Sequence, residues 1–253
     1  MTPQDRLSLE SPTQPPLLLY LPGIDGTGRL LFRQPRLYER YFVECANYPQ
    51  DEPRTYGQLA DDAARRIERL GNGRPAVVLA ESFGGAVALT LALRRPDLVS
   101  RLILSNSFAY FPRRITIRLA ATLGAFLPAW RAPVTTRGIR SLFMFGLGVP
   151  REIRNAFFER SSDVPMDICG QRLGMIANLD LRGRLAEIET PCLVLVGTHD
   201  LVVSPSAGRG LARLLPNARL VERPVGHVAL VHPLIDILEL LDDATLRPAY
   251  LGQ

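Results

Sequence analysis

Three polar residues follow apolar runs of strand length, and their types together suggest nucleophilic catalysis. Ser82 lies within AVVLAESFGGAVAL (76–89), while Asp200 and His227 follow two later apolar runs. A serine hydroxyl is a weak nucleophile until a base takes its proton, and an acid must orient that base. The chain order serine, aspartate, histidine is typical of loops at the carboxyl edge of a parallel sheet. We therefore predict a catalytic triad of Ser82, Asp200 and His227.

The segment around Ser82 gives the strongest signal. A strand runs directly into a tight turn, and the small residues Ala80 and Gly84 flank the serine at the positions of G-x-S-x-G, with alanine replacing the first glycine. Phe83 begins a predicted helix, so its N–H is expected to face a developing oxyanion. The alternative is a serine that caps the helix, with glycines serving close packing.

The loop LPGIDGTG (21–28) is predicted to supply a second oxyanion donor, the N–H of Ile24. Gly23 is expected to allow a sharp turn, and Asp25 to accept hydrogen bonds from its own turn, as Asx residues do. The alternative, a phosphate cradle, is disfavoured because the loop matches neither G-x-G-x-x-G nor the Walker spacing.

Other histidines, acids and cysteines are weaker candidates. His199 precedes the predicted acid and His232 precedes a proline, so both are interpreted as loop or cap residues. Asp180 is a rival to Asp200 as the acid. The cysteines are interpreted as inert, with two of them on buried strands, and no Cys/His spacing suggests a metal; they are Cys45, Cys169 and Cys192. We expect no metal and no organic cofactor.

The elements around these residues alternate between strands and helices. Apolar runs predict strands over 17–21, 41–46, 76–80, 101–106, 192–197 and 218–223, and helical patterns cover 57–70, 83–95, 204–215 and 233–242. Continuous apolar runs are typical of strands buried on both faces of a parallel sheet. The prediction is an α/β fold in a single domain over 1–253, with a mostly parallel sheet of about six strands and helices on both faces.

One stretch, about 109–184, contains no good strand and is too long for a loop. It is interpreted as a helical cap inserted over the carboxyl edge of the sheet, where it would cover a pocket. Its segments 115–130 and 139–149 are rich in apolar residues, which indicates either ordinary packing or a tunnel for an acyl chain. The large ones are Phe126, Trp130, Phe143, Met144 and Phe145.

The motifs PGIDG (22–26), ESFGG (81–85) and LILSN (102–106) resemble those of the α/β-hydrolase superfamily. Within it, the chain is similar to the hydrolase portion of plant esterase/lipase/thioesterase proteins, the phytyl ester synthase and diacylglycerol acyltransferase-like group, with bacterial relatives. A weaker similarity is to small bacterial carboxylesterases that act on carrier-bound acyl chains. The resemblance implies ester or thioester substrates with a long apolar chain.

The plant proteins also contain an acyltransferase-like region with a His and an Asp separated by four residues. Here His232 and Asp236 have three residues between them, so hydrolysis is the expected reaction. Acyl transfer or thioester cleavage by the same triad remains an alternative. A receptor or other ligand-binding protein on the same fold, without turnover, is a third hypothesis.

The charge distribution limits the partners. The 253 residues carry a net charge of +5 and contain no lysine, which is most simply codon bias. Residues 111–160 hold nine arginines and two glutamates, a local charge of +7; the arginines are 113, 114, 118, 131, 137, 140, 151, 154 and 160. No motif accompanies this charge, which argues against nucleic acid. An acidic acyl carrier, an anionic membrane surface or a merely solvated basic face are the alternatives.

The N-terminal segment shows no basic stretch followed by an apolar core, so no signal peptide is predicted. The apolar stretch 119–130 is shorter than the roughly 20 residues that a spanning helix needs. We expect a cytoplasmic protein, with peripheral association at a membrane as the alternative.

Overall fold

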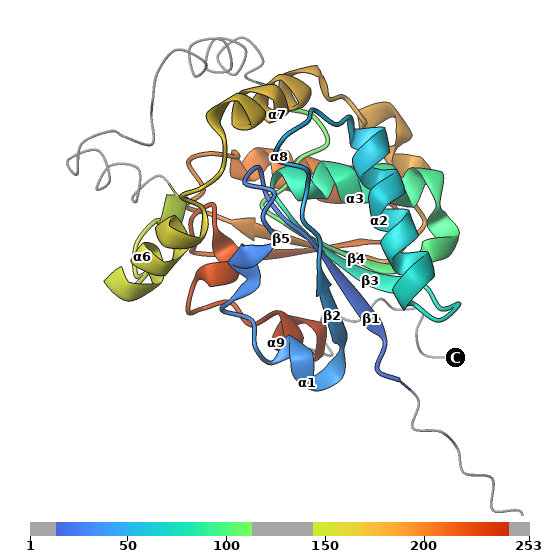
Figure 1. Ribbon diagram of the computed structural model, residues 1–253, viewed down its shortest axis with the longest axis horizontal. Coiled ribbons are helices and arrows are strands. Elements are labelled where there is room, and N and C mark those ends of the chain that lie inside the picture. Colours follow the sequence, from blue (N-terminus) through green and yellow to red (C-terminus); the bar gives the residue numbers. More distant parts are fainter. Residues whose placement is uncertain (1–13, 113–143, 243–253) are drawn as a thin grey trace, which may run out of the picture.

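The structure is a computed structural model that describes residues 14–112 and 144–242 (Figure 1). Six strands form one sheet in the order β2-β1-β3-β4-β5-β6, and every neighbouring pair is parallel. The strands are β1 (Leu17–Leu21), β2 (Phe42–Cys45), β3 (Ala76–Glu81), β4 (Val99–Ser105), β5 (Cys192–Gly197) and β6 (Ala218–Arg223). The predicted fold, a parallel α/β sheet of about six strands, is confirmed.

Side chains of the central strands alternate between two apolar cores, one on each face of the sheet. In β1, Leu17, Leu19 and Leu21 enter one core and Leu18 and Tyr20 enter the other. The first core packs against α2 (Tyr56–Leu70), α3 (Phe83–Arg94) and α8 (Pro205–Leu214), and the second against α1 (Leu37–Arg40) and α9 (Ile237–Asp242). Figure 1 shows these two helix layers on opposite sides of the strands. This double burial explains why the central strands β1, β3 and β5 are nearly continuous apolar runs.

The last predicted helix begins later than expected. The pattern predicts a helix from 233, but α9 starts at Ile237, because residues 232–235 form a turn in which the Ile235 N–H donates to the His232 carbonyl. The Asp236 carboxylate then accepts from the Glu239 N–H at 3.1 Å and caps the helix. His232 therefore does not open the helix.

Between β4 and β5 the described residues contain no strand. They form α6 (Arg151–Arg160), α7 (Met166–Asn178) and a short 3-10 helix over Arg182–Glu187. This segment contacts the loop after β6, since the Gly226 and Val228 N–H groups donate to the carbonyls of Phe145 and Met144. It therefore lies at the carboxyl edge of the sheet, while the limits of the predicted cap, 109–184, stay a prediction. Several predicted cap residues lie outside the described residues: Arg113, Arg114, Arg118, Phe126, Trp130, Arg131, Arg137, Arg140 and Phe143.

Within residues 14–112 and 144–242, no helix has the length and apolar character needed to cross a bilayer. The same residues contain no cluster of three or more His, Cys, Asp or Glu side chains that could hold a metal ion. Cys169 and Cys192 are buried, whereas Cys45 is half-buried, because β2 is an edge strand of the sheet.

Candidate active site

Ser82, His227 and Asp200 form one line of hydrogen bonds. His227 Nε2 lies 3.0 Å from Ser82 Oγ, and His227 Nδ1 lies 2.8 Å from Asp200 Oδ2. All three residues are buried, with exposed fractions of 8%, 6% and 4%. They come from the carboxyl ends of β3, β6 and β5, three strands that are distant in sequence but share one edge of the sheet. The structure thus brings together the three residues that the sequence singled out.

The backbone at Ser82 is strained, as at the sharp strand-to-helix turns that lift a serine out of the plane of the sheet. Its φ of 51° and ψ of −116° are rare for a residue other than glycine. The turn is held on both sides, since the Ser82 N–H donates to the Ser105 carbonyl and the Ser107 hydroxyl donates to the Ser82 carbonyl, each at 2.9 Å. The Ser82 side chain makes no capping bond to α3, which disfavours a helix cap as its role.

Gly84 is required because a larger side chain would have no space, not because of its backbone conformation. A methyl group on Gly84 would overlap the backbone carbonyls of Leu21 and Pro22. The first turn of α3 is therefore pressed against the end of β1, which brings the loop after β1 beside Ser82. A methyl group on Gly23 in that loop would lie 3.9 Å from Ser82 Cβ.

Asp200 is held so that only one of its oxygens is free for the histidine. Its Oδ1 accepts from the N–H groups of Val202 and Val203, each at 2.8 Å. A carboxylate can only accept, so His227 Nδ1 must carry the proton that faces Oδ2. In the neutral imidazole Nε2 is then an acceptor for the Ser82 hydroxyl. The arrangement therefore orients a base toward the serine.

Charges around His227 favour its protonated form. Burial alone lowers the pKa of His227, but the carboxylates of Asp200 and Glu81 outweigh burial and raise it above its ordinary value. Glu81 is itself buried, and burial raises its pKa from 4.5 to about 7. Tyr20 donates to Glu81 Oε2 at 3.2 Å, whereas Oε1 has no hydrogen-bond partner among the described residues.

The loop after β1 contains the turn expected at Gly23. Gly23 does not have a positive φ; the left-handed residues of the loop are Gly26 and Gly28, at φ of 67° and 70°. The turn closes through the Gly26 N–H, which donates to the Gly23 carbonyl at 3.1 Å. Asp25 accepts from the Thr27 N–H at 2.9 Å, which confirms the predicted bond within its own turn. Phe83 is the first residue of α3, so its N–H lacks an acceptor within the helix.

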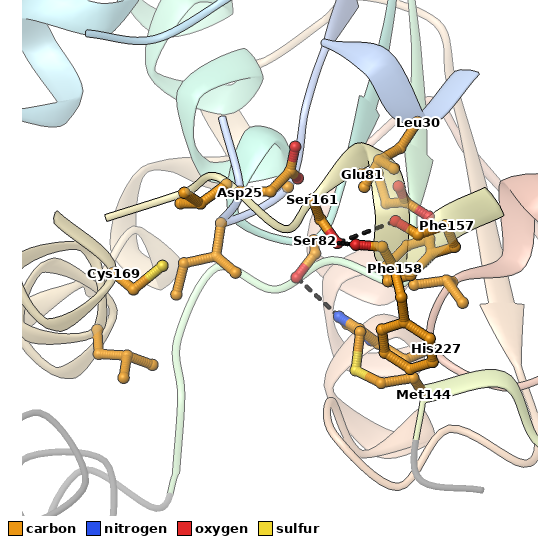
Figure 2. A pocket seen from close by; sticks show the side chains of 15 residues that line it. Asp25, Leu30, Glu81, Ser82, Met144, Phe157, Phe158, Ser161, Cys169 and His227 are labelled. Atoms are coloured by element: carbon orange, nitrogen blue, oxygen red, sulfur yellow. Dashed lines mark hydrogen bonds between the residues drawn. The ribbon is translucent and has the colours of Figure 1, made fainter. Parts of the chain in front are cut away.

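Ser82 and His227 open into an apolar cavity of about 380 Å³ (Figure 2). Ile24 and Asp25 of the β1 loop form part of its wall. The other wall comes from the segment between β4 and β5 and consists of Met144, Phe157, Phe158, Ser161, Val164, Cys169 and Leu173. Of the two predicted tunnel residues that are described, Met144 lines the cavity, whereas Phe145 packs against Phe157, with ring centres 5.1 Å apart.

The alternative candidates lie elsewhere. His199 is exposed, and His232 is bonded to the backbone, with Nε2 3.0 Å from the Leu147 carbonyl oxygen. Asp180 forms an ion pair with Arg182 at 2.7 Å and lies away from His227 in an isolated bridge with Tyr110. These side chains therefore take no part in the hydrogen-bonded line.

Sequence reasoning missed two residues that hold the site. Asn106 at the end of β4 donates to the carbonyls of Gly226 and His227 at 2.8 and 2.6 Å, and its Oδ1 accepts from the Gly197 N–H at 2.6 Å. A polar residue ending the apolar run LILSN is the signal that could have found it. Arg172 is buried in α7. The sequence signal that could have found it is its spacing of four residues from Ile168 and from Ile176, which places an arginine on the buried face of the helix.

The parallel sheet places a serine at the turn from β3 to α3, where α/β hydrolases carry a G-x-S-x-G motif. The family model described as the alpha/beta hydrolase fold matches residues 18–232. The chain therefore belongs to the α/β-hydrolase family.

Individual relatives agree with this assignment. The chain is 31% identical over 169 residues to a pimeloyl-[acyl-carrier protein] methyl ester esterase of Nitrosospira multiformis, covering 62% of this chain and 64% of that protein. It is 38% identical over 99 residues to phytyl ester synthase 2, chloroplastic, of Arabidopsis thaliana, covering 37% of this chain and 14% of that protein. The chain thus spans less than two thirds of either relative.

Solved structures show the same architecture. A hydrolase from Pseudomonas aeruginosa superimposes with a TM-score of 0.74 at 25% identity, covering 86% of this chain and 84% of that chain. An esterase from Thermogutta terrifontis gives a TM-score of 0.72 at 22% identity, covering 87% of this chain and 85% of that one. At this identity the second likeness concerns the fold alone.

Proposed function

We propose that the protein hydrolyses carboxylic esters of apolar acyl groups through a covalent acyl-enzyme. The observation that carries the proposal is the continuous line from Asp200 through His227 to Ser82 at the wall of an apolar cavity. Nucleophile, base and orienting acid are within hydrogen-bond distance of one another, as nucleophilic catalysis requires.

In the first half-reaction His227 Nε2 takes the proton of Ser82 while Oγ bonds to the ester carbonyl carbon. The carbonyl oxygen becomes an oxyanion, for which the N–H groups of Ile24 and Phe83 are the proposed donors, each contributing about 3–4 kcal/mol in comparable sites. The tetrahedral intermediate collapses, the ester C–O bond breaks, and the leaving alcohol takes the proton from His227. The Asp200 carboxylate orients and stabilises the imidazolium.

In the second half-reaction water attacks the acyl-serine ester. His227 takes a proton from that water, a second oxyanion forms in the same place, and collapse returns the proton to Ser82 Oγ as the carboxylic acid leaves. The raised pKa of His227 favours the imidazolium that both steps need. Both half-reactions use these side chains, the two backbone N–H groups and water.

The apolar cavity supports an acyl chain as the part of the substrate that binds there. Leu30, Phe157, Phe158 and Val164 offer no charge to a polar head group. The names of the Nitrosospira and Arabidopsis relatives both refer to esters, and the first also to an acyl carrier protein. A carrier-bound acyl ester is therefore part of the proposal, with thioesters as a further substrate class.

The test combines labelling and turnover. A fluorophosphonate probe should label the wild-type protein at Ser82 and fail to label Ser82→Ala, and p-nitrophenyl esters of increasing chain length should be hydrolysed only by the wild type. Folded wild-type protein that neither reacts with the probe nor turns over any ester or thioester in the panel would refute the proposal. In that case a receptor on this fold would remain.

Acyl transfer to an alcohol is a second candidate, favoured by the similarity to a phytyl ester synthase. The same acyl-enzyme would then react with an alcohol instead of water, and exclusion of water by a cover over the cavity would favour this outcome. Adding a long-chain alcohol to the ester assay separates the two: transfer yields a new ester, whereas hydrolysis yields only the free acid.

A further inference from the structure

Arg172 is a buried cation whose hydrogen bonds all go to backbone carbonyls. Only 5% of the residue is exposed. Its Nη1 lies 2.8 Å from the Ile24 oxygen and 3.0 Å from the Asp25 oxygen, and its Nη2 lies 2.9 Å from the Pro49 oxygen. It forms no ion pair with a carboxylate among the residues that the structure describes. A buried charge is costly unless it is fully hydrogen-bonded, so these three bonds must hold the guanidinium in place.

Two of the three acceptors belong to the loop that carries the proposed oxyanion donor. The Ile24 N–H shares its peptide group with the Gly23 carbonyl, which accepts from the Gly26 N–H at 3.1 Å. The next carbonyl, that of Ile24 itself, accepts from Arg172. The peptide that presents the donor is thus fixed by the turn on one side and by Arg172 on the other.

The shape of the loop fits the guanidinium. Gly26 has a φ of 67°, and a methyl group there would lie 2.6 Å from Arg172 Nη1. The guanidinium carbon also lies 5.6 Å from the centre of the Tyr48 ring. The Tyr48 N–H donates to the Gly26 carbonyl at 2.8 Å, so the same loop is held from its other face.

The helix that carries Arg172 also lines the cavity. Cys169 and Leu173, three residues before and one after Arg172 in α7, form part of the cavity wall (Figure 2). One helix therefore contacts both the space proposed for the acyl chain and the loop proposed to bind the oxyanion.

We infer that Arg172 is a positioning residue that aligns the Ile24 N–H with the oxyanion and so joins α7 to the catalytic centre. This inference rests on the proposed ester hydrolysis. Guanidinium is suited to the role because its planar fork spans several carbonyls, which the point charge of a lysine does not. Loss of one oxyanion donor costs about 10²- to 10³-fold in kcat, so a displaced donor should cost part of that.

The experiment compares Arg172→Met and Arg172→Lys with Arg160→Met. Arg160 is the matched control, because it also belongs to the segment between β4 and β5 and stacks on an aromatic ring, that of Phe32 at 4.4 Å, which lies beyond the loop 21–28. The quantities to measure are kcat, KM, the unfolding temperature and the affinity for a trifluoromethyl ketone. The ketone carries the same acyl chain as the ester substrate, and its adduct with Ser82 places an oxyanion in the site.

The expected result for Arg172→Met is a fall in kcat of about 10- to 100-fold, an equal fall in the affinity for the ketone, and a KM within about threefold of wild type. For Arg172→Lys, kcat and the ketone affinity should lie between those of the wild type and Arg172→Met. For Arg160→Met, both should match the wild type. These effects should appear well below the unfolding temperature of each variant.

Unchanged kcat and ketone affinity in folded Arg172→Met would overturn the inference, as would a change confined to KM or to thermal stability. If Arg172→Met does not fold, the same comparison is made with Arg172→Lys and Arg172→Gln. Failure of the wild type to label at Ser82 would instead refute the proposed hydrolysis. The two failures are therefore distinguishable.

Discussion

Asn106 is the residue whose removal should show how the site is held together. It is 3% exposed, and its amide makes three hydrogen bonds to backbone groups, one at the last residue of β5 and two in the loop that follows β6. Its φ of 46° lies in the left-handed region, which asparagine tolerates better than alanine. Asn106→Ala therefore removes three buried bonds and strains the backbone at once.

The magnitude follows from these contacts. Each lost bond costs about 1 kcal/mol, and a left-handed alanine adds about 1–2 kcal/mol. The sum is about 4–5 kcal/mol of unfolding free energy. For a domain of this size, this corresponds to a fall in Tm of about 12–15 °C. Because Asn106 holds the carbonyl of His227 itself, ester turnover should also fall by at least about tenfold at temperatures where the variant is folded.

Asn106→Asp tests the same contacts without changing shape or backbone preference. Its carboxyl keeps the bond from the Gly197 N–H but sets an oxygen against the carbonyls of Gly226 and His227. Burial and this repulsion should raise the pKa of the new carboxyl in the folded state. A raised pKa means stability that is present at low pH and lost as pH rises, so the deficit in Tm should be smaller at pH 5 than at pH 8.

Thermal unfolding at the two pH values measures both variants, with Asn217→Ala as the control. Asn217 also donates to a carbonyl, that of Glu189 at 2.7 Å, but it lies at the surface, and its loss should shift Tm by no more than about 2 °C. A Tm for Asn106→Ala within about 3 °C of wild type would refute the reasoning. A deficit for Asn106→Asp that is equal at both pH values would refute it as well.

Three further substitutions test other parts of the structure. Glu81 has its pKa raised from 4.5 to about 7, so its stabilising contribution is full below pH 4.5 and is lost as pH rises through 7. Glu81→Gln should therefore make the free energy of unfolding less dependent on pH. Denaturant titrations at pH 4 and pH 8 should show that the difference between the two pH values is smaller than in the wild type by up to about 3 kcal/mol. An equal difference in the variant and the wild type would contradict this. Asp200→Asn should lower kcat by roughly 10³- to 10⁴-fold with little change in Tm, because the amide supports the wrong tautomer of His227; a rate near wild type would exclude Asp200 as the orienting acid. Gly84→Ala should lower Tm by about 6 °C or more, because its methyl group overlaps a backbone carbonyl of β1, whereas Gly174→Ala, with open space around it, should be neutral or stabilising; equal Tm values for the pair would contradict the packing argument.

Much of the fold could be predicted because each strand has its own local signal. β1, β5 and β6 begin and end where their apolar runs do, and the loops that follow β3, β5 and β6 hold the three residues of the proposed triad. A parallel sheet brings carboxyl ends to one edge whatever the strand order, so the triad needed no knowledge of topology. The predicted start of the last helix was wrong. The pattern of residues 233–236 continues the helical spacing, but Asp236 caps the helix and sets its first residue at Ile237.

The residues that hold the site could not be predicted in the same way, because their partners are set by tertiary packing. Arg172 lies 148 residues from Ile24, and nothing near it in the sequence indicates a carbonyl acceptor. The local excess of arginine lies in residues 111–160, whereas Arg172 lies beyond it, in a helix whose buried stripe includes Ile168 and Ile176. A cation on an apolar stripe needs a polar partner on the opposing surface. In this fold the partners of Arg172 are the carbonyls of Ile24 and Asp25 in the loop after β1 and that of Pro49. The position of Arg172 on its helix is therefore itself a sign that this side of α7 packs against polar backbone near the catalytic edge.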